Sequence, residues 1–303
     1  MEITARPVAL LFAGQGHPQL GMGADLWNRT PATREVWDCA SDISGLDLRR
    51  LCLRGPMPRL IATPVQQLAV TAINLSLYRL LQPHIGDISA VCGHSVGEYS
   101  ALYAAGVFTL EQLFAAIHFR AAVMHQLSQR QKGAMLAVKG MDYAAMRALL
   151  DRYHAELDIS CDNSRCQQVV GGPLAALNRF ACSVGGVYKL GVSGAWHTRL
   201  MQEGVQPMRD FLATLNVARP CRTIVMNVSG QPAVQPEAIR ENLALHLTHS
   251  VRWRATIDSL LARQTPPLLI ELSHKPWLSA LLTDFPGFSP AMAVHCRKLL
   301  YCQ

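Results

Sequence analysis

The chain has 303 residues, half of them hydrophobic and 16% charged, which is typical of a globular enzyme larger than one average domain and excludes a disordered chain. No apolar run is long enough to span a membrane, so we expect a cytoplasmic protein that does not bind a membrane. The net charge is +7, but no run of Lys or Arg is long enough to indicate nucleic-acid binding, so we expect no nucleic-acid partner. Nine cysteines without a Cys-x-x-Cys pair fit a reducing compartment and predict no metal site.

The first segments predict the start of an α/β domain. A compact apolar strand over 8–12 runs into the glycine-rich loop Ala13-Gly14-Gln15-Gly16. Residues 25–82 have a largely helical pattern, which ends in a long apolar helix that starts at Pro64.

The next segment carries the most informative motif. An apolar strand over 88–92 leads into Gly93-His94-Ser95-Val96-Gly97, and residues 98–105 continue as a helix. The pattern G-x-S-x-G between a strand and a helix is typical of the turn that exposes a nucleophilic serine, and the helix N-terminus favours developing negative charge. Ser95 is therefore the candidate nucleophile, although the same pattern also occurs in ordinary small-residue turns.

The chain then forms a helix over 110–126 and changes character. The following pattern is strand, helix, two strands, helix and strand, over 134–140, 142–154, 156–163, 167–172, 173–184 and 186–193. This βαββαβ order is that of a ferredoxin-like unit. The rest predicts helices over 200–215, 236–247 and 253–263 and strands over 223–227 and 268–272. We therefore predict an α/β fold with a large catalytic domain formed by 1–126 and 194–303 and a small subdomain inserted at 127–193.

A serine nucleophile needs a positioned base, which is most often a histidine. His197 lies in the small-residue loop over 191–198, between a predicted strand and a predicted helix, where an imidazole can face a cleft. His94 is adjacent to Ser95, but consecutive side chains leave a tight turn in different directions, so we expect it to pack or hydrogen-bond beside the site. Because a lone histidine is more often structural, the residues alone leave the identity of the base open.

Several segments together resemble the malonyl-CoA:acyl carrier protein transacylase family, including the stand-alone acyltransferases that serve polyketide synthases. They are GQG followed by GMG, GHSVGEYSALYAAGVF, HFRAAVM, GVSGAWHTRLM and HLTHSVRW, and the resemblance runs nearly end to end. It implies an α/β-hydrolase-like core, with Ser95 acylated by an acyl-CoA, His197 as its base and Arg120 as the ligand of the malonyl carboxylate. The main-chain N–H groups of Gln15 and Val96 are then the expected oxyanion hole.

The resemblance also implies supporting roles. Trp196 stands where malonyl-selective relatives usually carry phenylalanine, and its bulk favours malonyl over methylmalonyl by about 1 to 3 kcal/mol. A main-chain carbonyl orients the histidine in the family, and the register places it at His246, where relatives usually carry glutamine. His94, Asn163 and Asn227 are expected near the substrate, although both asparagines equally suit turns.

We therefore expect an acyltransferase that moves a malonyl group from malonyl-CoA to the phosphopantetheine thiol of an acyl carrier protein through a malonyl-serine. We expect a monomer without a cofactor, and its basic surface would suit an acidic carrier protein. Two alternatives stay open: an acyl hydrolase that clears acyl groups from carrier proteins, and a non-catalytic carrier-protein docking module. Arg120 and Trp196 weigh against the hydrolase, and the intact set of Gln15, Ser95, Arg120 and His197 weighs against the docking module. Fatty-acid, polyketide and malonate pathways all remain compatible with the sequence.

Overall fold

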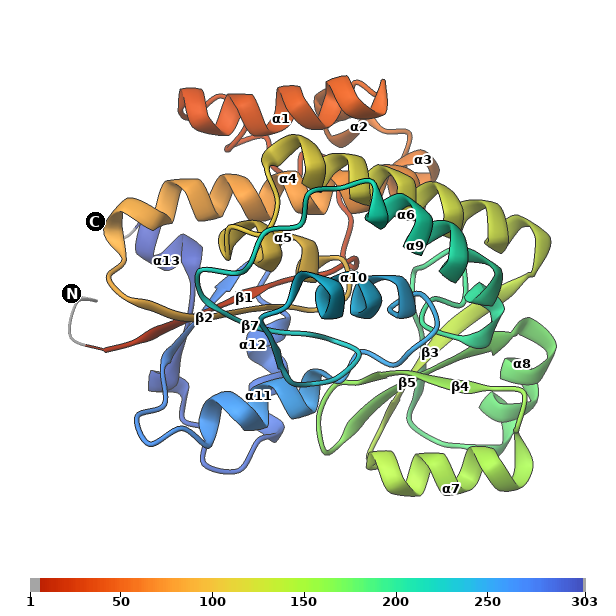
Figure 1. Cartoon of the computed structure of the whole chain (residues 1–303). Helices are drawn as coiled ribbons and strands as arrows, with labels where there is room; N and C mark the ends of the chain where they lie inside the picture. Colours follow the sequence, from red (N-terminus) through yellow and green to blue (C-terminus); the bar gives the residue numbers. More distant parts are fainter. Residues whose placement is uncertain (1–5, 302–303) are drawn as a thin grey trace.

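The computed structural model describes residues 6–301, in which a six-stranded sheet forms the centre of the larger part (Figure 1). Its order is β10-β9-β1-β2-β7-β8, with the pairs parallel except for β7 and β8. The bounds are β1 (Val8–Phe12), β2 (Ile88–Gly93), β7 (Thr223–Val225), β8 (Pro232–Ala233), β9 (Leu268–Leu272) and β10 (Ala293–His295). Every residue of β1 is buried, as a continuous apolar run in a central parallel strand requires. The sequence predicted β1 and β9 with these bounds, and it missed the short strands β8 and β10.

Helices cover this sheet (Figure 1), and most residues of the long helix α4 are buried. It is buried on nearly every side and carries mainly apolar residues, which is the pattern of a helix enclosed by other elements. The α-helices of this part are α1 (Pro31–Ser44), α2 (Leu48–Arg54), α3 (Met57–Ile61), α4 (Thr63–Leu81), α5 (Gly97–Ala104), α6 (Leu110–Arg130), α9 (Val205–Ala213), α10 (Pro236–Leu245), α11 (Trp253–Leu261), α12 (Leu278–Leu281) and α13 (Cys296–Tyr301). The 3₁₀-helices are η2 (Gln82–His84), η3 (Arg199–Gly204), η4 (Leu282–Asp284) and η5 (Pro290–Met292).

A second, antiparallel sheet has the strand order β4-β5-β3-β6. Its elements follow the chain as β3 (Gly133–Lys139), α7 (Tyr143–Tyr153), β4 (Asp158–Asp162), β5 (Gln167–Pro173), α8 (Leu174–Ser183) and β6 (Val187–Lys189). The prediction of a ferredoxin-like βαββαβ unit is therefore confirmed. One face of the sheet packs with α7 and α8 through a separate core that includes Leu136, Val170 and Phe180. The alternate residues on β3, β4 and β5, Met135, Ala137, Cys161 and Val169, belong to the main core instead.

Two predicted elements differ from the structure. The strand predicted over 186–193 ends at Lys189, because the glycine-rich loop that follows leaves the sheet. The helix predicted over 200–215 begins as η3 and becomes α-helical only at Val205. The two parts meet at Gly204, where a Cβ atom would lie 2.6 Å from the Val123 side chain of α6, so this junction packs against α6 only with glycine.

The limits of the two domains stay a prediction. The proposed boundary between residues 126 and 127 falls inside α6, which continues to Arg130. Residues 1–5 and 302–303 of the predicted large domain lie outside the described part of the chain. Within the described part, no helix is both long and apolar enough to cross a bilayer.

Candidate active site

The turn between β2 and α5 holds Ser95 in a conformation that side-chain-bearing residues seldom adopt, with a φ of +52°. Its two glycines are required by close packing. A Cβ atom on Gly97 would lie 2.1 Å from the carbonyl oxygen of Phe12, and one on Gly93 would lie 2.0 Å from the carbonyl carbon of Gly97. The spacing of G-x-S-x-G thus follows from the approach of α5 to the sheet. The turn places Ser95 at the carboxyl end of β2 and at the N-terminus of α5.

Ser95 meets His197 across a hydrogen-bonding distance. Its Oγ atom is 2.8 Å from Nε2 of His197, and Nδ1 of His197 is 2.6 Å from the carbonyl oxygen of His246. Because a carbonyl only accepts, Nδ1 carries the proton and Nε2 is free to accept one from Ser95. Burial lowers the pKa of His197 well below its usual value, and His246 and the charge of Arg120 lower it further. The imidazole is therefore a neutral base at pH 7.

Buried polar groups support the serine turn from behind. Oδ1 of Asn227 accepts from the Ser95 N–H at 2.8 Å, its Nδ2 donates to the Gly93 carbonyl at 2.6 Å, and its own N–H donates to Oε1 of Glu98 at 2.6 Å. The other Glu98 oxygen is 3.0 Å from Nδ1 of His246, although without the alignment of a full hydrogen bond. Burial raises the pKa of Glu98 to about 8 and lowers that of His246 well below its usual value, so this contact joins neutral groups and not an ion pair.

The loop after β1 brings further N–H groups to the serine turn. A Cβ atom on Gly14 would lie 2.4 Å from the carbonyl oxygen of His94, so glycine at this position allows the loop to touch the turn. The Ser95 N–H is already engaged. By contrast, the N–H groups of Gln15 and Val96 donate to no other group in the described residues. Two unengaged N–H groups in this loop and this turn are the kind of donors that stabilise an oxyanion.

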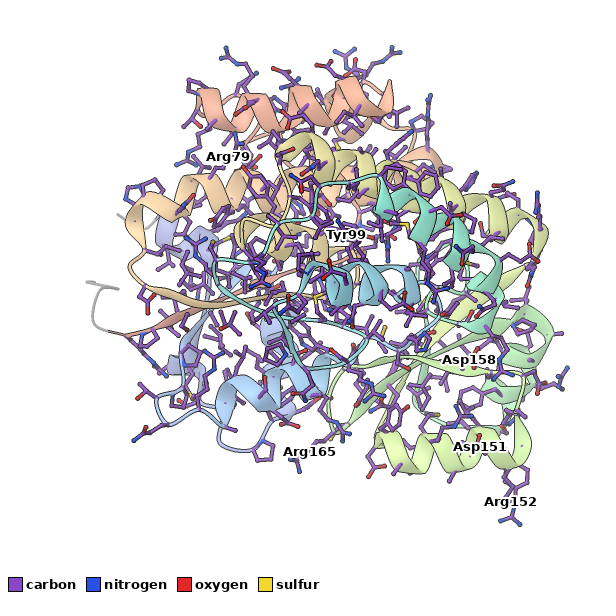
Figure 2. The ribbon with its side chains drawn as sticks, in the orientation of Figure 1. Arg79, Tyr99, Asp151, Arg152, Asp158 and Arg165 are labelled. Carbon is purple, nitrogen blue, oxygen red and sulfur yellow. The ribbon has the colours of Figure 1, made fainter. Side chains whose placement is uncertain are left out.

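Arg120 on α6 is fully buried, and much of its guanidinium group is unpaired. Nη1 donates to Oε1 of Gln67, whereas Nε and Nη2 have no partner within residues 6–301. The guanidinium carbon is 5.7 Å from the ring centre of Tyr99, which lies at the centre of the molecule (Figure 2). Burial lowers the pKa of Arg120, while Tyr99 and Glu98 act in the opposite direction, and an arginine stays charged at pH 7. A buried cation with two free donors suits a carboxylate.

A cavity of about 400 Å³ lies next to Ser95, between the two sheets. The predicted site residues that line it are Gln15, His94, Ser95, Asn163, Trp196 and His197. Val96, Arg120 and His246 are fully buried and are not among its lining residues. Lining residues that the sequence did not indicate include His17, Met135, Cys161, Lys189 and Trp277. They come from separate elements, and no local pattern in the sequence connects them.

His94 has partners other than Ser95. Its Nε2 atom is 2.8 Å from Oδ1 of Asn163, and its ring packs edge-to-face on Trp253 and Trp277. Burial lowers its pKa to about 4, so it is neutral and donates from Nε2 to Asn163. Trp196, which is almost fully buried, folds against the loop before it. In residues 6–301, no cluster of three His, Cys, Asp or Glu side chains is arranged to hold a metal ion.

Comparisons with known proteins agree with this geometry. Residues 9–286 match the family model described as acyl transferase domain. The chain is 34% identical over 259 residues to polyketide biosynthesis protein ThaF of Burkholderia thailandensis, covering 83% of this chain but only 22% of ThaF. It is 32% identical to the mitochondrial malonyl-CoA-acyl carrier protein transacylase of Mus musculus, covering 84% of this chain and 72% of that protein. The crystal structure of malonyl-CoA:acyl carrier protein transacylase from Xanthomonas oryzae matches with a TM-score of 0.86 and 30% identity, over 93% of this chain and 92% of that one.

Proposed function

Because the chain belongs to the acyl transferase domain family, we propose that it is a malonyl-CoA:acyl carrier protein S-malonyltransferase. The observation that carries this proposal is the combination of Ser95 hydrogen-bonded to His197 with the buried, partly unpaired Arg120. Ser95 and His197 form the nucleophile and base that acyl transfer requires, and Arg120 favours an acyl group that ends in a carboxylate. The names of the mouse and Xanthomonas relatives support the same substrate.

In the first half-reaction, Ser95 takes the malonyl group from CoA. Nε2 of His197 accepts the Oγ proton while Oγ attacks the thioester carbonyl carbon, and the N–H groups of Gln15 and Val96 stabilise the oxyanion. The carbonyl of His246 accepts from Nδ1 and favours the imidazolium that forms. The carbon–sulfur bond then breaks, and the CoA thiolate leaves with the proton from His197. The product is a malonyl ester of Ser95.

In the second half-reaction, the phosphopantetheine thiol of a carrier protein takes the malonyl group from Ser95. His197 accepts the thiol proton, the sulfur attacks the ester carbonyl, and the serine oxygen leaves with that proton. Arg120 holds the carboxylate throughout, which keeps the ester carbonyl in place for the incoming thiol. Trp196 fills the space next to the base and disfavours a branch at C2 of the acyl group.

The exposed basic residues near the cavity suit an acidic carrier protein. Lys189 is exposed and lines the cavity itself. Arg165 follows Asn163 in the loop between β4 and β5 and lies at the periphery of the molecule (Figure 2). Opposite charges at the rim of a site steer the encounter of two proteins. The monomeric state, the cytoplasmic location and the lack of a cofactor or nucleic-acid partner remain predictions from the sequence.

The test of the proposed function follows radiolabelled malonyl-CoA. Purified protein is incubated with malonyl-CoA and a holo carrier protein, and label in the carrier and in free malonate is counted separately. We expect nearly all of the label in the carrier protein, and none when the apo carrier protein, which lacks the thiol, replaces it. Release of free malonate as the main product would identify a hydrolase and contradict the proposal.

A further inference from the structure

A continuous chain of hydrogen bonds, buried at Gln67 and partly buried at Gln15, connects Arg120 to Gln15. Nη1 of Arg120 donates to Oε1 of Gln67, and Nε2 of Gln67 donates to Oγ1 of Thr63 at 3.1 Å. The Thr63 hydroxyl in turn donates to Oε1 of Gln15 at 3.0 Å. Nε2 of Gln15 then donates to Oε1 of Gln66 at 2.9 Å. This hydrogen-bond chain therefore joins Arg120, which is proposed to bind the substrate carboxylate, to the loop in which Gln15 carries the proposed oxyanion donor.

The side chains in the middle of this chain have no access to water. Thr63, Gln66 and Gln67 are each 0% exposed and lie on the first turns of α4, a helix that is otherwise mostly apolar. Burying an amide or hydroxyl without a hydrogen bond is unfavourable, and each of these three side chains has at least one partner within this chain of hydrogen bonds, although Nε2 of Gln66 has none in the described residues. For Gln67 and Thr63 the partners lead in one direction to Arg120 and in the other to Gln15.

The cation at one end sets the direction of every hydrogen bond in the chain. A guanidinium group only donates, so Gln67 must present its oxygen to Arg120 and its NH₂ group to Thr63. The Thr63 oxygen accepts from that group, and its O–H is left to donate to Gln15. Hydrogen bonds that run in one direction polarise one another, so the position of Arg120 bears on the position of Gln15.

At both ends of this hydrogen-bond chain, donors are left without a protein partner in the described residues. At Arg120 the bond to Gln67 uses one nitrogen and leaves Nε and Nη2 for a carboxylate. At Gln15 the bonds to Thr63 and Gln66 use only the side-chain amide and leave the main-chain N–H unengaged in the described structure.

We propose that Gln67 and Thr63 are positioning residues that couple carboxylate recognition at Arg120 to the oxyanion loop at Gln15. This inference rests on the proposed function, because it concerns how the same site prefers malonyl over acetyl groups. Its consequence is that the substrate carboxylate accelerates the acylation of Ser95 and does not merely tighten binding. Thr63 therefore influences acyl selectivity although it does not contact Arg120, which binds the carboxylate.

The test measures the acylation of Ser95 by rapid quench with malonyl-CoA and, separately, with acetyl-CoA. For each substrate, the dependence on concentration separates the acylation rate constant from the half-saturating concentration. The variant Thr63→Val keeps the size of the side chain and removes both of its hydrogen bonds. Thr71→Val is the matched control, because Thr71 is equally buried on the same helix and its hydroxyl has no partner in the described residues.

We expect Thr63→Val to lower the ratio of malonyl to acetyl acylation rate constants by ~5-fold or more, the equivalent of one neutral hydrogen bond. Gln67→Met removes a bond to a charged group, so the malonyl rate constant is expected to fall by ~10-fold to ~140-fold. Thr71→Val is expected to leave the ratio as in the wild type. A ratio that stays at the wild-type value in both Thr63→Val and Gln67→Met would overturn the inference.

Gln67→Glu gives a second line of evidence if the apolar variant folds poorly. A carboxylate at position 67 would keep the oxygen that Arg120 donates to, and it would also neutralise Arg120 in place of the substrate. We expect this variant to melt near the wild-type temperature and to lose its preference for malonyl-CoA. Retention of the full preference would overturn the inference.

The wild-type measurement separates this inference from the proposed function. If wild-type protein is acylated equally by malonyl-CoA and acetyl-CoA, the proposed function and the coupling both fail. If wild-type protein prefers malonyl-CoA and the Thr63 and Gln67 variants keep that preference, only the coupling fails.

Discussion

Replacing Arg120 with glutamine removes the buried cation while keeping a polar side chain next to Gln67. In the wild-type protein, Nε and Nη2 are free and can bind a carboxylate with two charge-assisted hydrogen bonds. Removing one partner of a buried charge pair costs about 2 to 5 kcal/mol, because the other charge is left unpaired. At 1.4 kcal/mol for each factor of ten, kcat/KM for malonyl-CoA should fall by about 30-fold to about 4,000-fold.

The assay compares malonyl-CoA with acetyl-CoA in transfer to one carrier protein. Acetyl-CoA has no carboxylate, so Arg120→Gln should leave its kcat/KM nearly unchanged. Arg130→Gln is the control, since Arg130 lies on the same helix with a largely exposed side chain. An equal fall for both substrates in Arg120→Gln, with the melting temperature maintained, would show that Arg120 supports the fold or the chemistry in general and does not select a carboxylate.

Three further predictions follow from the geometry around Ser95. Gly97→Ala should lower the free energy of unfolding by about 1 to 3 kcal/mol in urea titration, because the added carbon would meet the Phe12 carbonyl at 2.1 Å, and an unchanged value would contradict the packing argument. Because the pKa of His197 is lowered, its neutral base form persists below pH 6.5. We therefore expect kcat/KM to stay level as the pH falls from 8 to 6.5 and to decline only below 6.5. A fall in kcat/KM with its midpoint at or above pH 6.5 would contradict this. Trp196→Ala should raise kcat/KM for methylmalonyl-CoA relative to malonyl-CoA by about 10-fold to 200-fold, whereas an unchanged ratio would show that the indole does not limit the acyl group.

The fold was largely accessible from the sequence because its elements carry local signals. The central strand β1 is a continuous apolar run, and the second sheet follows a pattern of strands and helices bounded by turn residues. The strands β8 and β10 were missed, since two or three residues at the edge of a sheet leave no periodicity to detect. The break before α9 depends on contact with α6, which no local pattern contains.

The candidate site was accessible where its residues belong to motifs. Ser95 was found from the strand-turn-helix pattern, while His197, Arg120 and Gln15 required the resemblance as well. Of the groups behind these residues, His246 and Asn227 were named with the help of the resemblance, but Glu98 was missed, because its importance depends on tertiary contacts. Glu98 looks like an ordinary acidic residue at a helix start, yet it is fully buried against Asn227.

The polar residues of α4 illustrate the same limit. Gln66 and Gln67 interrupt an apolar helix, and in the sequence they could equally have faced solvent. The structure buries both, which requires partners, and the partners lead to Gln15 and Arg120. Polar residues among the mainly apolar residues of a long helix are the signal that could have identified them.

Ser95 is proposed to carry a malonyl group between CoA and a carrier-protein thiol. Intact-mass spectrometry after a brief incubation with malonyl-CoA tests whether it does. We predict one malonyl adduct on the wild-type protein, mapped to the peptide that contains Ser95, absent in Ser95→Ala and lost when a holo carrier protein is added. The absence of an adduct on the wild-type protein under conditions in which transfer proceeds, or an adduct that persists in Ser95→Ala, would contradict the account.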